Sequence, residues 1–133
     1  MFGYVAGLPA FLAYFVAGTV ILVVFASVYA LATPHKELTL IKGGNGAAVL
    51  AYLGAILGFS LPLASAAANS VSVIDFILWA LIGAVVQIAA FFVASATMSD
   101  LPGRITRGEM SAGAWAAGIA LAVGILNAAC MTY

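Results

Sequence analysis

The fold is decided by residues 8–31, whose sequence is LPAFLAYFVAGTVILVVFASVYAL. This run contains no Asp, Glu, Lys or Arg and lies within a charge-free window at residues 1–34. A helix of about 20 apolar residues, rising about 1.5 Å per residue, crosses the hydrocarbon core of a bilayer. Barrel strands would alternate polar and apolar residues, which this run does not do. The run therefore predicts a membrane-spanning helix, which we expect to be retained rather than cleaved as a signal peptide.

The composition of the whole chain also indicates a membrane protein, because 66% of its 133 residues are hydrophobic and only 6% are charged. Soluble domains are about 25% charged, so this composition excludes a soluble enzyme, a disordered chain and a nucleic-acid-binding protein. Three further charge-free windows occupy residues 43–74, 76–99 and 110–133. The sequence predicts an all-α membrane protein with four transmembrane helices, near 8–31, 47–69, 75–97 and 112–131.

The basic residues predict the orientation of these helices. Lys36 and Lys42 follow the first predicted helix, and Arg104 and Arg107 follow the third. In a four-helix arrangement all four lie on one side of the membrane, and the positive-inside rule makes that side cytoplasmic. Both termini are then expected to be periplasmic.

The two halves of the chain resemble each other. Phe11-x-x-Tyr14-x-x-x-Gly18 matches Phe76-x-x-Trp79-x-x-x-Gly83 at an offset of 65 residues. An offset of 64 aligns Gly44-Asn45 with Gly108-Glu109. We therefore predict two tandem, parallel helical hairpins, formed by residues 1–70 and 71–133, with a pseudo-axis along the membrane normal.

Small residues are concentrated in the second and fourth predicted helices, and bulky residues in the first and third. Close packing of small residues drives helix association in lipid, within one chain or between chains. The small set is Ala47, Ala48, Ala51, Gly54, Ala55, Gly58, Gly113, Ala117, Gly118, Ala120 and Gly124. The bulky set, expected to face lipid, is Phe15, Phe25, Tyr29, Phe91 and Phe92. Four short helices bury little by themselves, so we expect a homo-oligomer.

The candidate sites within the membrane are uncharged. Gln87 lies at the middle of the third helix, where its amide needs a polar partner, either as interhelical glue or as a permeation contact. Asn69, Asn127 and Cys130 are expected at the outer ends of the second and fourth helices, where either a polar patch or simple end-capping explains them. Asn69, Asn127 and Ser65 are also candidates for a pore lining. Pro62 lies four residues after Gly58 and predicts a kink in the second helix.

The remaining polar residues are interpreted as structural. His35 is expected to be a solvated loop histidine and Asp75 a helix cap. The Gly-rich segments before the second and fourth helices suit either an anion or simple caps at Asn45 and Glu109. No nucleophile with a base, carboxylate pair or metal-ligand cluster is evident in the sequence, so it predicts neither an enzyme nor a bound cofactor or metal.

Six segments, in order along the chain, carry a family resemblance: Thr33-Pro34-His35-x-Glu37, Leu40-Ile41-Lys42, Asn45-x-Ala47-Ala48, Pro62-Leu63-x-Ser65-Ala66-Ala67-x-Asn69, Ser72-x-x-Asp75 and Asn127-Ala128-Ala129-Cys130-Met131-Thr132. They closely resemble the YjfL family of bacterial inner-membrane proteins. The resemblance implies a bacterial inner-membrane location and two tandem copies of a two-helix domain of unknown function. It also implies gene neighbours that encode phage-shock-protein-A-like membrane-remodelling proteins and polyamine-related enzymes.

Two functions are compatible with these observations. The first is a non-enzymatic, homo-oligomeric membrane component in envelope maintenance or stress, which engages a cytoplasmic membrane-remodelling partner or lipid through its basic loops, residues 33–46 and 98–111. The second is a small oligomeric channel or transporter for an ion or small solute, lined by Gln87, Asn69, Asn127 and the kink at Pro62. The neighbouring genes that the resemblance implies favour the first function.

Overall fold

The computed structural model describes residues 2–131 and contains helices only within that range. The six helices are α1 (Phe2–Ala32), α2 (Glu37–Lys42), α3 (Gly46–Asn69), α4 (Val73–Thr97), α5 (Leu101–Thr106) and α6 (Met110–Ala129). α1, α3, α4 and α6 are long and apolar enough to cross a membrane, which confirms the four predicted transmembrane helices. The short helices α2 and α5 were not predicted.

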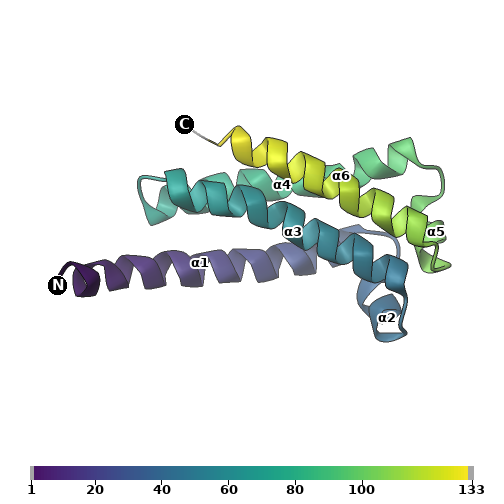
Figure 1. Ribbon diagram of the computed structural model, residues 1–133, viewed down its shortest axis with the longest axis horizontal. Helices are drawn as coiled ribbons and strands as arrows, with labels where there is room; N and C mark the ends of the chain where they lie inside the picture. Colours follow the sequence, from purple (N-terminus) through teal and green to yellow (C-terminus); the bar gives the residue numbers. More distant parts are fainter. Residues whose placement is uncertain (1, 132–133) are drawn as a thin grey trace.

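The four long helices alternate in direction along the chain, so α3 and α6 run parallel to each other (Figure 1). These two helices make the most extensive contact in the molecule, through their small residues. A methyl group added to Gly113 would collide with the Ala47 backbone, and one added to Gly124 would collide with the Gly58 carbonyl. The small residues therefore join the two halves of one chain, because only glycine allows the backbones to approach this closely.

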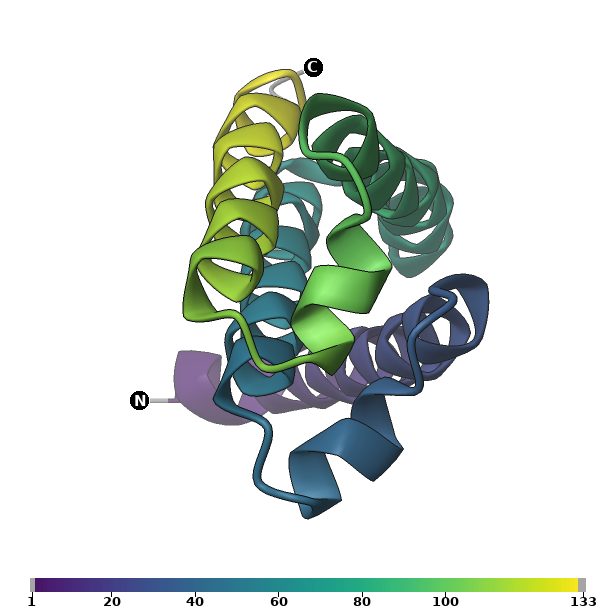
Figure 2. The same cartoon turned by 90° about the vertical axis from the view of Figure 1, so that its right-hand side faces the viewer.

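α1 lies beside this pair and is the least buried of the four long helices (Figures 1 and 2). Phe15 and Phe92 are largely exposed on the lipid-facing surface, as expected from their size. The same expectation is wrong for Phe25, Tyr29 and Phe91, which are at most 5% exposed. These three rings fill the space between α1, α3 and α4, because the small residues of α3 leave room there for large neighbours.

We call residues 33–45 the first connector and residues 98–109 the second connector. Their helices begin at Glu37 and Leu101, positions that are 64 residues apart. Each connector continues into a glycine with a left-handed backbone, Gly44 at φ 86° and Gly108 at φ 81°. Glycine is the residue that adopts this conformation at low cost. The shared layout supports the proposed two-part repeat, which stays a prediction.

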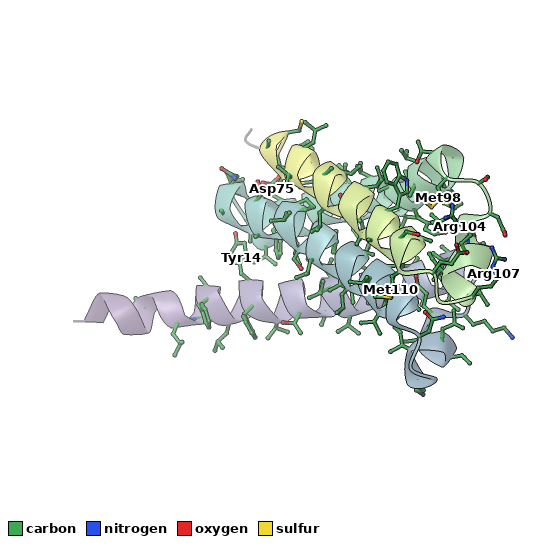
Figure 3. All side chains as sticks on the ribbon, turned by 45° about the vertical axis from the view of Figure 1, so that its right-hand side comes forward. Tyr14, Asp75, Met98, Arg104, Arg107 and Met110 are labelled. Atoms are coloured by element: carbon green, nitrogen blue, oxygen red, sulfur yellow. The ribbon has the colours of Figure 1, made fainter. Side chains whose placement is uncertain are left out.

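Both connectors lie at one end of the bundle, opposite the α3–α4 turn (Figure 1). Figure 3 shows Arg104 and Arg107 at this end and Asp75 near the other. Asp75 accepts a hydrogen bond from the Val71 N–H (3.1 Å), while Ser72 caps α4 through the Asp75 N–H. The carboxylate thus has the structural role that its position at the start of a helix predicts.

Candidate functional site

The two connectors are joined to each other by Asn45. Its side-chain oxygen accepts a hydrogen bond from the Ala48 N–H (3.0 Å), which confirms its predicted role as a cap of α3. Its amide nitrogen donates to the carbonyls of Ile105 (2.9 Å) and Thr106 (3.2 Å) in the second connector. A single side chain therefore holds the connectors together at the start of the central helices.

The first connector contains a buried pair of titratable side chains. His35 Nε2 lies 2.7 Å from Glu37 Oε1, and both side chains have 0% exposure. The expectation of a solvated loop histidine is wrong. The chain turns back after α1, and the His35 ring packs against the Phe91 ring of α4, with 5.6 Å between centroids. The loop thus covers the end of the bundle instead of extending into water.

Aromatic rings enclose this pair. Tyr29, one turn before the end of α1, meets Phe91 edge-on and lies 6.2 Å from the Tyr52 ring of α3. The Tyr52 hydroxyl donates to the Ala26 carbonyl at 2.7 Å, so it anchors α3 to α1. The pair is therefore surrounded by the ends of three long helices, and water does not reach the side chains.

Burial controls the electrostatics of the pair. Desolvation raises the pKa of the Glu37 carboxyl, and the hydrogen bond and charge of His35 offset only part of that rise. Two polar atoms of the pair, His35 Nδ1 and Glu37 Oε2, are buried without a hydrogen-bond partner in the described chain. Buried polar atoms without a partner are uncommon and costly, so this site is maintained against a free-energy penalty.

The second connector has the opposite character. Leu101, 64 residues after Glu37, occupies the first position of α5 and is fully buried. The charges of this connector lie at the surface and pair with each other: Arg104 with Glu109 (3.3 Å), and Arg107 with Asp100 (3.3 Å) and Glu109 (3.2 Å). Glu109 stands at the N-cap of α6 but makes no side-chain capping bond, so its predicted cap role is wrong.

The exposed cations of the first connector are not neutralised in this way. Lys36 and Lys42 are exposed, and neither forms an ion pair within residues 2–131. The one acidic residue of this connector, Glu37, is buried against His35. The two predicted basic loops therefore differ: one presents free positive charge and the other a self-neutralised surface.

Gln87, the predicted intramembrane candidate, belongs to α4, is 2% exposed and bonds with its side chain to α6. Its amide nitrogen donates to the Ala120 carbonyl at 3.1 Å, and its oxygen accepts a hydrogen bond from Asn127 Nδ2 at 3.2 Å. Asn127 also donates to the Gly83 carbonyl at 3.2 Å. These hydrogen bonds join α4 to α6, which is the first of the two roles considered for Gln87.

The remaining intramembrane candidates form contacts of the same kind. The Ser65 hydroxyl donates to the Ala128 carbonyl of α6 at 2.8 Å, and Asn69 donates back to the Ser65 carbonyl at 2.8 Å. Asn69 thus bonds within α3, whereas Asn127 bonds to α4. Their hydrogen bonds thus go to different helices, and the polar patch stays a prediction. α3 continues through Pro62, which packs with Gly58 on its buried side; the kink stays a prediction.

Sequence reasoning missed Glu37 and Tyr29 as members of a site. The available signal was a histidine and a carboxylate two residues apart, directly after a transmembrane helix, followed by the apolar residues Leu38, Leu40 and Ile41. Within the described range, residues 2–131, no three His, Cys, Asp or Glu side chains come together as a metal-ligand cluster.

The fold and its apolar helices define a multi-pass integral membrane protein. A family model, Domain of Unknown Function (DUF350), matches residues 3–131. The inner membrane protein YjfL (UPF0719) of Escherichia coli K12 is 43% identical over 126 residues, which cover 95% of this chain and 96% of the relative. YjfL of Escherichia coli O157:H7 matches to the same extent. No solved structure matches.

The chain therefore belongs to the DUF350 family, which includes YjfL, as its sequence resemblance implied. The inner-membrane location of the relative, together with the four apolar helices, supports the same location for this chain.

Proposed function

We propose that this chain is a non-enzymatic inner-membrane component that holds a cytoplasmic membrane-remodelling protein at the envelope. The connectors form the docking surface, and the observation that carries the proposal is the free charge of Lys36 and Lys42 beside the self-neutralised second connector. Unpaired cations attract an acidic partner and speed its association. The positive-inside rule makes the connector end cytoplasmic and both termini periplasmic.

Self-association belongs to the same proposal. α1 has only 17% of its most apolar window buried, compared with 50% for α3. A homo-oligomer would cover more of α1 and would present several connector pairs to one partner, which raises avidity without new contacts. Mass photometry of the protein in nanodiscs measures the subunit number, and a uniform population of single chains would contradict this part of the proposal.

The docking role is tested by co-flotation. A purified phage-shock-protein-A-like protein, the class of partner that the family resemblance implies, is mixed with proteoliposomes of neutral lipid that contain the chain. We expect Lys36→Ala/Lys42→Ala to weaken binding about tenfold. The matched control, Arg104→Ala/Arg107→Ala, removes two cations that already have partners, so its effect is expected to be smaller. Equal binding to empty liposomes, or equal loss in both variants, would contradict the proposal.

A further inference from the structure

The buried pair of the first connector has no task in the docking proposal. A connector can be seated on the bundle with an apolar residue at this position, because the second connector does so with Leu101. The first connector instead places Glu37 there, with 1% exposure, against His35. Burying an ionisable pair gives less stability than a well-packed apolar side chain of similar size. A titratable group at this place therefore needs an explanation other than stability.

The number of protons on the pair decides its charge. With one proton shared between His35 and Glu37, the pair is neutral overall, either as two neutral groups or as an ion pair. Loss of that proton leaves a carboxylate beside a neutral imidazole and a net charge of −1. The site has no exposed side-chain surface on either residue, and Glu37 Oε2 has no partner in the described chain. A net charge in such a site is unfavourable unless water enters.

The groups around the pair do not neutralise that charge. α1 contributes Tyr29 and α3 contributes Tyr52, whose phenol groups carry no charge that could neutralise the Glu37 carboxylate. α4 contributes the uncharged Phe91 ring. Lys36, which lies between the two residues of the pair in the sequence, is exposed and forms no ion pair within residues 2–131, and Arg104 of α5 is paired with Glu109. Water can therefore solvate the carboxylate only if the connector separates from the bundle.

We propose that the His35–Glu37 pair is a proton-binding site, which seats the first connector on the bundle while it holds its shared proton and loosens the connector when that proton leaves. The released proton passes to water at the connector end. Burial raises the pKa of Glu37, so the proton is held to a higher pH than an ordinary carboxyl group would hold it. Loosening of the first connector exposes its backbone and alters the spacing of Lys36 and Lys42.

Hydrogen exchange by the protein in nanodiscs tests this inference, and the second connector is the internal reference. The measured quantity is the protection of residues 37–45 relative to that of residues 101–109, from about pH 5 to about pH 9. The ratio cancels the intrinsic pH dependence of exchange. We expect the wild-type ratio to fall as pH rises. The fall is about tenfold for each pH unit by which the pKa of the seated pair exceeds that of the pair in the loosened connector.

Two variants assign the effect to the pair. Glu37→Gln keeps the size of the side chain and cannot lose a proton, so its ratio is expected to stay constant with pH. Glu109→Gln removes a partly exposed carboxylate from the second connector and should keep the wild-type fall. If Glu37→Gln does not fold, Glu37→Leu reproduces the buried residue of the second connector and serves in its place. A wild-type ratio that is constant with pH, or an equal fall in the Glu37 variant, would overturn the inference.

Discussion

The two connectors have the same length of helix, the same left-handed glycine and the same place in the bundle, but different chemistry. The second is seated by a buried leucine and carries its charges as surface ion pairs. The first is seated by a buried His–Glu pair and carries unpaired lysines. Leu101 shows that an apolar residue at this position is sufficient to seat a connector on the bundle. We therefore propose that the first connector carries the function, because its buried pair is not needed to seat a connector on the bundle.

The largest loss of stability is expected when the second connector is given a buried carboxylate without a histidine. Leu101→Glu places an ionisable group in a fully buried position with no partner. We expect it to lower the free energy of unfolding by about 3–5 kcal/mol, the cost of an uncompensated buried charge. Unfolding in SDS, followed by circular dichroism, measures the change. Thr106→Glu, at an exposed position of the same helix, should change it little, and equal losses would contradict the account.

The next largest effect concerns the contact that places both connectors at one end. Gly124→Ala would push the added methyl group into the Gly58 backbone, so α3 and α6 must separate. We expect a loss of about 1–3 kcal/mol in unfolding free energy. Gly118→Ala lies on the same helix, and nothing stands within 4 Å of its added methyl group. A thermal melt in detergent that shows equal shifts for the two variants would disprove the close packing.

A smaller effect is the pH dependence of stability, to which Glu37 of the first connector contributes and Leu101 of the second does not. The pKa of Glu37 is raised in the folded protein, so its contribution to stability is present below the ordinary carboxyl pKa and is lost as pH rises through the raised value. We therefore expect wild-type stability to decline over that window and Glu37→Gln to decline less. Leu101 has no proton to lose, and Leu101→Met should keep the wild-type slope. Thermal midpoints measured over a pH series would show parallel slopes if the pair did not titrate.

The smallest effect is expected at the surface of the second connector. Arg107→Ala removes ion pairs to Asp100 and Glu109 in which the arginine side chain is 58% exposed. Exposed ion pairs contribute about 0–1 kcal/mol each, so the unfolding free energy should hardly change. Raising the salt concentration should likewise leave the wild-type value nearly constant. A loss comparable to that of Leu101→Glu would mean that charge, and not the buried leucine, seats this connector.

Much of the fold was predictable from the sequence because its signal is local. The charge-free windows locate the four long helices to within a few residues, except where α1 begins. The small residues of the second and fourth predicted helices indicated a close contact, although only the structure shows that it joins the two halves of one chain. Composition and hydrophobic length are sufficient for these features, because lipid imposes them.

The candidate site was less predictable because it depends on contacts between distant segments. His35 follows Pro34 in a short polar stretch, which is typical of a solvated loop. Its burial depends on Phe91, more than 50 residues away, and on Tyr29, which was expected to face lipid. The six-residue helices α2 and α5 are too short for a hydrophobic period to reveal them. A partner for Gln87 could be expected from the sequence, because an amide in the middle of a transmembrane helix needs one wherever the neighbouring helices lie.

We expect both connectors to lie at one face of the membrane, on the cytoplasmic side. Cysteine labelling in spheroplasts tests it most directly, with Thr39→Cys, Thr106→Cys and Val71→Cys introduced singly on a Cys130→Ser background; all three positions are exposed. We predict that a membrane-impermeant maleimide labels position 71 in intact spheroplasts, and labels positions 39 and 106 only after lysis. Labelling of 39 and 106 from opposite sides, or of both from outside, would contradict it.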